Sequence, residues 1–152
     1  MTEQTAPSGL DIIQAGLKTG QNIAAIGETM DFTLTEAAFG KAVFTGHPGA
    51  RHLNPQGIVH GGYAATLLDS AVGISIFTAL PPGKTFTTLE LKVNYTRALP
   101  QDGSAVTATG EIIHVGRTTA TAEGRIHDTE GRLLAFATTT CLVLDIPSRR
   151  GT

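Results

Sequence analysis

The spacing of hydrophobic and polar residues divides the chain into short early segments, a central apolar run and a final part that alternates. GLDIIQAGLKTG, residues 9–20, predicts a short amphipathic helix that ends at Gly20. MDFTLTEAAF and GKAVFTG, residues 30–39 and 40–46, have strand-like composition and meet at Gly40, which predicts a hairpin turning around that glycine. HPGARHLNPQG, residues 47–57, is rich in Pro, Gly and Asn, and it predicts a loop that leads into the central run.

The central run, from Gly61 to about Leu80, is apolar on nearly every side of a helix. Its apolar positions are Ala64, Leu67, Leu68, Ala71, Val72, Ile74 and Ile76. A helix without a polar stripe is surrounded by protein on most sides, and the sequence LPPGK ends it. One carboxylate, Asp69, lies in the middle of this helix and needs an explanation.

The final part of the chain has the period of β-strands. After Lys84 the apolar and polar residues alternate, with Leu89, Leu91, Val93 and Tyr95 on one predicted face and Thr88, Glu90, Lys92 and Asn94 on the other. Residues 104–114, 118–128 and 132–145 form three more strand-like runs, separated by the turn sequences VGR and TEGR. The order of elements predicts an α+β domain with a hotdog fold, a curved antiparallel sheet wrapped around one long helix. We expect residues 1–30 to form an N-terminal tail and short helix, 31–146 the hotdog domain and 147–152 a C-terminal tail.

Composition and charge narrow the classes of protein. A chain of 152 residues fits one domain, and its formal net charge of −2 gives no reason to expect nucleic acid or an anionic membrane as partner. Its one cysteine, Cys141, excludes an intrachain disulfide and is expected in the core. The histidines His47, His52, His114 and His127 lack ligand spacing, so we expect them to be structural or at the surface, and no metal site is predicted. No signal peptide or membrane span is evident, which predicts a cytoplasmic protein.

The segment Asn-x-x-Gly-x-x-His-Gly-Gly, from Asn54 to Gly62, is followed by Asp69 nine residues after His60. This pattern resembles the hotdog-fold acyl-CoA thioesterases of the phenylacetate-degradation (PaaI-like) type, over roughly residues 32–145. The resemblance implies an active site formed by Asn54, His60, Gly61 and Asp69. It also implies that a Ser or Thr at the start of the strand after the helix assists, and Thr88 is the matching position, with Thr87 as the alternative register.

The residues themselves suggest how such a site works. If the helix begins near Gly61, Asp69 lies about 12 Å along its axis, so His60 and Asp69 of one chain do not reach the same atom. We therefore predict a composite site at a twofold interface, an arrangement that the resemblance also implies. The Gly61 N–H at the helix start would stabilise an oxyanion, and Asp69, partly desolvated, would activate water or attack directly. Thr88 would orient the water or Asp69, while Asn54 and His60 would fix the loop or the thioester. The choice between general-base and covalent-anhydride chemistry stays open.

Acyl-CoA is the predicted substrate, and no separate cofactor is expected. Arg97 and the turn residues Gly116, Arg117 and Thr118 are the candidate contacts to the CoA phosphates, with Arg149 and Arg150 as weaker candidates. The acyl group is not readable from the sequence, although Phe77, Phe86 and Leu89 are candidates to line its pocket. We expect at least a homodimer. Pairing of dimers into a tetramer is common in relatives, and the polar strand face would offer it a surface.

Two alternatives remain beside the thioesterase. A non-catalytic acyl-CoA-binding or regulatory hotdog protein is the first, but Asp69 would be superfluous there and no DNA-binding helix-turn-helix or basic extension is present. A hotdog hydratase is the second. Those enzymes usually place an Asp and a His differently in the loop before the helix, whereas here His60 is followed by two glycines and the acid comes later.

Overall fold

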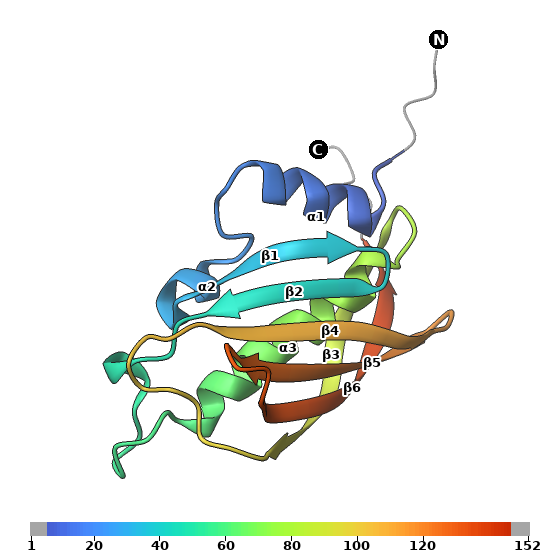
Figure 1. The fold of residues 1–152 in the computed structure, drawn as a ribbon. Helices are drawn as coiled ribbons and strands as arrows, with labels where there is room; N and C mark the ends of the chain where they lie inside the picture. The colour runs from blue at the N-terminus through green and yellow to red at the C-terminus, as the bar shows by residue number, and fades with distance from the viewer. Residues whose placement is uncertain (1–5, 147–152) are drawn as a thin grey trace.

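Six strands form one antiparallel sheet in the order β1-β2-β4-β5-β6-β3, in a computed structural model that describes residues 6–146 (Figure 1). The strands are β1 (Phe32–Ala38), β2 (Lys41–Gly46), β3 (Lys84–Tyr95), β4 (Val106–Val115), β5 (Thr119–Asp128) and β6 (Leu133–Asp145). The helices are α1 (Gly9–Lys18), α2 (Ala25–Met30), the 3-10 turn η1 (Ala50–His52) and α3 (Gly61–Thr78). This arrangement confirms the predicted hairpin, central helix and meander.

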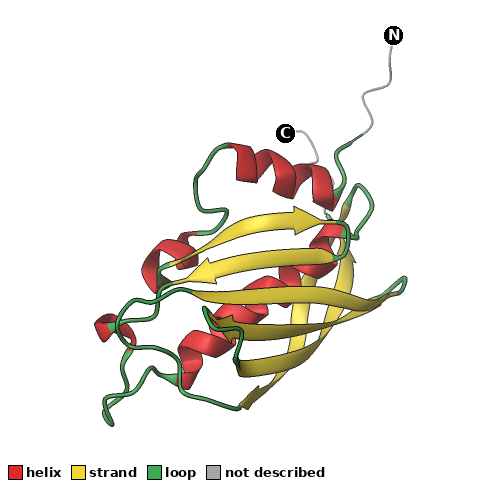
Figure 2. Ribbon diagram, viewed as in Figure 1, coloured by secondary structure: helices red, strands yellow, loops and turns green. Residues whose placement is uncertain are grey.

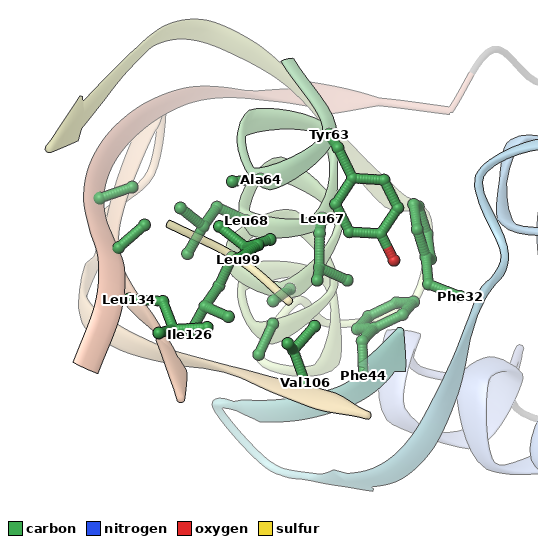
Figure 3. Close-up of a cluster of buried hydrophobic side chains, with 14 of the residues drawn as sticks. Phe32, Phe44, Tyr63, Ala64, Leu67, Leu68, Leu99, Val106, Ile126 and Leu134 are labelled. Atoms are coloured by element: carbon green, nitrogen blue, oxygen red, sulfur yellow. The ribbon is translucent and has the colours of Figure 1, made fainter. Parts of the chain in front are cut away.

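The sheet curves around α3, which runs through its concave side (Figure 2). Tyr63, Leu67 and Leu68 of α3 are at most 1% exposed and lie among Phe32, Phe44, Ile126 and Leu134 of the surrounding strands (Figure 3). Burial on this scale is the main source of stability, since each fully buried large apolar side chain contributes about 1.5–3 kcal/mol. The predicted hotdog architecture is therefore confirmed.

Gly110 of β4 lets α3 approach the sheet closely. A methyl group at Gly110 would overlap the carbonyl of Ala71 in α3, and one at its cross-strand partner Gly124 would come within 2.8 Å of Val72 Cγ1. The absence of side chains at these two positions leaves a depression in the middle of the sheet. The helix segment that contains Asp69 rests beside it, so these glycines help to fix the depth at which Asp69 lies.

The segment before β1 contains one predicted and one unpredicted helix. Ser8 caps α1 by accepting from Asp11 N at 3.2 Å, while the Asp11 carboxylate accepts from Ser8 N at 2.9 Å, a reciprocal capping box. The sequence did not predict α2, which has six residues, no side-chain hydrogen bond at its N-cap and Gly27 in its interior. It ends at Asp31, a non-glycine residue with a left-handed φ of 56°. Helix α2 is therefore a product of packing rather than of helix propensity.

A β-bulge at Leu89 corrects the predicted alternation in β3. Thr88 pairs with Cys141 and Glu90 pairs with Thr140, so that Leu89 is an extra residue between them. The bulge puts Leu89 outside, where it is 58% exposed, and leaves Thr88 facing α3 rather than on one face with Glu90. The prediction that Thr88 shares one polar face with Glu90, Lys92 and Asn94 is therefore wrong.

In residues 6–146, no helix combines the length and the apolar character that crossing a membrane requires. The same residues contain no group of three or more His, Cys, Asp or Glu side chains that could hold a metal ion. Arg149 and Arg150, the weaker candidates for CoA phosphates, lie outside the described residues together with the rest of the predicted C-terminal tail.

Candidate active site

Asp69 lies on α3 opposite β3, where Thr88 Oγ1 donates a hydrogen bond of 3.1 Å to Asp69 Oδ1. Of the two register alternatives, Thr88 makes this contact, whereas Thr87 is exposed on the other face of the strand. Thr88 in turn has a buried neighbour: Cys141 Sγ lies 3.9 Å from Thr88 Oγ1, within donor distance for sulfur. Burial raises the pKa of the Cys141 thiol, which keeps it a neutral S–H donor, and Cys141 is a core residue as predicted.

A pocket of about 160 Å³ opens beside the Asp69 carboxylate. Asp69 and Thr88 form one polar end, while Phe32 and Phe44 from the first hairpin and Phe86 from β3 provide apolar walls. Strands β1 and β3 are the two edges of the sheet, so the pocket lies where the curved sheet leaves α3 uncovered. Residues 22–27, which lead from α1 into the first half of α2, close this gap. Of the three side chains predicted to line the acyl pocket, only Phe86 does so here.

The loop before α3 is held by local hydrogen bonds that involve the predicted residues. Asn54 Oδ1 accepts from Gln56 N at 3.0 Å and from Ile58 N at 3.2 Å. The Asn54 side chain therefore stabilises the turn of the loop through hydrogen bonds to its backbone. His60 is the N-cap of α3, and its Nδ1 accepts from Gly62 N at 2.8 Å. That bond leaves Nε2 of His60 as the ring nitrogen able to donate to a ligand.

His52 supports the same loop from inside. Its backbone oxygen accepts from His60 N at 2.7 Å, and its ring Nδ1 accepts from Gly49 N at 3.0 Å. The ring packs against Tyr63 with centroids 4.6 Å apart. Burial, together with the positive charge of Arg51, lowers the pKa of the His52 imidazole and favours the neutral ring that this hydrogen bond requires. The expectation of a structural histidine at this position agrees with these contacts.

Gly61 is the first residue of α3, and its N–H has no acceptor in the part of the chain that the structure describes. The first amides of a helix lack intrahelical acceptors, and the next one, Gly62 N–H, is already bonded to His60. Tyr95 at the end of β3 donates from its hydroxyl to Gly61 O at 2.9 Å, and a methyl group at Gly61 would lie 3.1 Å from that ring. Sequence reasoning missed this role of Tyr95, because the alternation placed it only as one of the residues on the apolar face of the strand.

The predicted catalytic residues fall into two separate groups in one chain. Asp69 and Thr88 line the pocket between the sheet edges, whereas His60 lines a different pocket, with His52 and Tyr63, at the start of α3. The continuous helix from Gly61 to Thr78 keeps Gly61 and Asp69 about 12 Å apart along its axis. One chain therefore does not bring the candidate oxyanion donor to the candidate base.

The candidate CoA contacts are also divided. Arg97 is exposed and donates at 3.0 Å to the backbone oxygen of Leu133, the first residue of β6. Arg117 and Thr118 lie in the β4–β5 turn, whose next residue Thr119 pairs with Leu142 near the other end of β6, nine residues and about 30 Å along the strand from Leu133. Gly116 N donates to Thr119 O at 2.8 Å, so this amide is already engaged within the turn. Arg97 and Arg117 of one chain do not reach the same phosphate group.

A curved sheet around a buried helix, with a helical carboxylate facing an apolar pocket, places the molecule in the hotdog class. The family model of the thioesterase superfamily matches residues 56–135, and the chain belongs to that superfamily. The chain is 29% identical over 116 residues to a 1,4-dihydroxy-2-naphthoyl-CoA hydrolase of Listeria monocytogenes, covering 76% of this chain and 93% of the relative. It is 30% identical over 121 residues to the medium/long-chain acyl-CoA thioesterase YigI of Salmonella typhimurium, covering 71% and 77%.

Solved structures agree with this assignment. The phenylacetic acid degradation protein PaaI of Thermus thermophilus superposes with a TM-score of 0.71 at 30% identity, covering 78% of this chain and 98% of that one. A thioesterase of Streptococcus pneumoniae, described as hypothetical and solved with coenzyme A, superposes with a TM-score of 0.72 at 31% identity, covering 82% and 94%. The comparisons confirm the predicted family and the prediction of a thioester hydrolase. The roles of individual residues stay predictions.

Proposed function

We propose that the protein hydrolyses acyl-CoA thioesters at a site to which two copies of the chain contribute. The hydrogen bond from Thr88 to Asp69 at the polar end of an apolar pocket is the main support. An acyl group fits the apolar walls, and its thioester carbon then lies near a carboxylate that can activate water. The coenzyme A bound in the Streptococcus pneumoniae relative supports CoA as the thiol part of the substrate.

The second copy supplies the oxyanion donor. In this reaction water adds to the carbonyl carbon, the C–S bond breaks, and the proton that Asp69 takes from water passes to the leaving thiolate. Gly61 N–H of the partner stabilises the oxyanion that forms in between, and His60 Nε2 or the loop held by Asn54 positions the thioester. Direct attack by Asp69 would instead give an anhydride that water then opens. Water that opens this anhydride at the Asp69 carboxyl carbon leaves its oxygen in Asp69, so ¹⁸O in Asp69 after a single turnover in H₂¹⁸O identifies the second route, whereas the first route places it only in the acid product.

The free edge of the sheet supports a twofold pairing. Strand β3 is 12 residues long and lies at an edge of the sheet, with Leu89 58% and Tyr95 53% exposed. A long unpaired edge with apolar side chains is a liability unless another strand covers it. Antiparallel pairing of β3 with its copy brings the Tyr95 end of one strand toward the Thr88 side of the other, and Tyr95 contacts Gly61. The minimal assembly is then a dimer with two sites.

Thiol release from a panel of acyl-CoAs tests the proposal. The panel contains phenylacetyl-, hydroxybenzoyl- and straight-chain acyl-CoAs, and wild type is compared with Asp69→Asn. We expect turnover by wild type and its loss in Asp69→Asn with an unchanged melting temperature. Asp145→Asn, the same change at a carboxylate that is 81% exposed, is the matched control and should retain activity. Full activity of Asp69→Asn would refute the mechanism. No turnover by wild type, with acyl-CoA binding retained, would favour the non-catalytic alternative.

A further inference from the structure

A second apolar space adjoins the pocket beside Asp69. This groove, of about 440 Å³, lies under α1 and is lined by nine residues, none of them charged. Ile12 and Ile13 of α1 form one side, and Phe77 of α3 lies on the other. Ile12 remains 42% exposed although it faces this space. Uncovered apolar side chains around a concavity are typical of a binding surface.

The two spaces are continuous through shared walls. Ile23, Ala24, Ile74 and Phe86 line both the pocket and the groove. The Phe86 ring packs on Gly73, where a methyl group would come within 2.9 Å of it, and it lies 6.1 Å from the Phe77 ring, centroid to centroid. Phe86 therefore stands at the passage from the Asp69 pocket to the groove.

The volumes distinguish two kinds of acyl group. A cavity of about 150 Å³ holds one benzene molecule, so the Asp69 pocket alone, at about 160 Å³, takes one aromatic ring or a chain of roughly six carbons. A single ring would leave the groove unused. A longer straight chain would fill the pocket and then pass Phe86 into the groove, where it would cover the apolar side chains of Ile12 and Phe77.

We propose that the groove under α1 receives the distal part of a straight acyl chain whose thioester end lies at Asp69. The substrate class is then straight-chain acyl thioesters longer than about six carbons. Phe86 is the specificity-determining residue at the passage. This inference rests on the proposed function, because it assigns the acyl group of that same site.

A charge introduced into the groove tests the path of the chain. Ile12→Glu places a carboxylate in the groove, and Gln14→Glu adds the same charge two residues along α1, at an exposed position that does not line it. In wild type, kcat/KM should rise by up to about fourfold for each methylene added beyond hexanoyl, as burial of the chain continues. Ile12→Glu should lower the ratio of dodecanoyl-CoA to hexanoyl-CoA turnover by about tenfold, because only the longer chain meets the charge. Gln14→Glu should leave this ratio unchanged.

Changing the passage gives an independent readout. Phe86→Ala widens it and should raise the ratio of dodecanoyl to hexanoyl turnover, whereas Phe86→Trp narrows it and should lower that ratio. The inference is overturned if phenylacetyl- or hexanoyl-CoA is the best substrate of wild type, or if Ile12→Glu and Gln14→Glu act alike. Melting temperatures of all four variants confirm that they fold.

Binding separates failure of this inference from failure of the proposed function. S-hexyl-CoA and S-dodecyl-CoA are thioethers that no thioesterase hydrolyses, and calorimetry measures their binding whether or not the protein is active. Tighter binding of the dodecyl compound, lost in Ile12→Glu and kept in Gln14→Glu, supports the groove even where turnover is absent. Equal binding of both compounds rejects it even where turnover is present.

Discussion

Gly61 combines a free N–H with the absence of a side chain, and two substitutions separate these properties. Gly61→Pro removes the N–H, yet proline is favoured at the first position of a helix, and the preceding residue His60 already has a compatible φ of −59° and ψ of 134°. Gly61→Ala keeps the N–H and adds the same Cβ beside the exposed Tyr95 ring. We expect Gly61→Pro to lower kcat by about a hundred- to a thousandfold and Gly61→Ala to lower it much less. Equal losses, measured by thiol release, would assign the effect to crowding instead of the oxyanion.

Thr88 is the residue that contacts Asp69 through a hydroxyl, and valine has nearly its shape without that group. Thr88→Val should lower kcat by about ten- to a hundredfold, the usual value of a hydrogen bond to a charged group. Thr88→Ser should restore most of the activity, and Thr87→Val, on the exposed face, should have little effect. Steady-state thiol-release rates of the three variants test this prediction. An unchanged kcat in Thr88→Val would show that Thr88 has no role in the mechanism.

At the residue scale, the sequence predicted which positions matter better than how they are arranged. The spacing from Asn54 to Asp69 identified a loop, a helix start and a helical carboxylate, all present in the structure. The contact between Thr88 and Asp69 depends on the bulge at Leu89, and strict alternation would have placed Thr88 with Glu90. A bulge has no reliable local signature, because its extra residue is accommodated by the neighbouring strand.

At the scale of elements, the fit of α3 into the sheet depends on small residues in β4 and β5. Gly110→Ala would push the added methyl against the Ala71 carbonyl, and α3 must then move away from the sheet. We expect a loss of about 1–3 kcal/mol in the free energy of unfolding, the usual cost of overpacking. Gly49→Ala is a matched control, because the nearest atom to its added methyl is 3.8 Å away. Urea denaturation measures both variants, and similar free energies would show that α3 does not rest on Gly110.

The long periodic elements and the first hairpin were predictable, whereas the short helix α2 was not. Helix α3 and strands β3 to β6 have ten or more residues each, and their periods are visible in the sequence. Helix α2 has six residues, and it exists because residues 22–27 cover the pocket between the sheet edges. Because only the folded sheet creates that gap, the sequence of this segment alone does not predict the helix.

At the scale of the whole molecule, one chain holds the Asp69 pocket and the start of α3 as two separate places. The length of the helix was enough to predict that His60 and Asp69 of one chain lie apart, since eight residues span about 12 Å. The sequence indicated that a partner chain would complete each site, but not where that chain binds. Its position depends on how two exposed β3 edges pair, and that depends on surfaces that no local pattern encodes.

Mixed dimers test directly whether the site is shared between chains. One chain has Asp69→Asn and the other Gly61→Pro, each tagged differently and produced together. In a shared site, the mixed dimer has one site with both wild-type residues and one with both lesions. Random pairing makes about half of the dimers mixed, so about a quarter of wild-type activity should return, although each variant alone is inactive.

Purification through both tags should raise the recovered activity to about half that of wild type per dimer, because every dimer then holds one intact site. If each site were built within a single chain, every site would keep one lesion, and the mixed dimer would be as inactive as its parents. The recovered fraction thus reports which chain supplies the oxyanion donor to each Asp69. A monomeric protein would show no recovery at any mixing ratio and would elute as a monomer in size-exclusion chromatography.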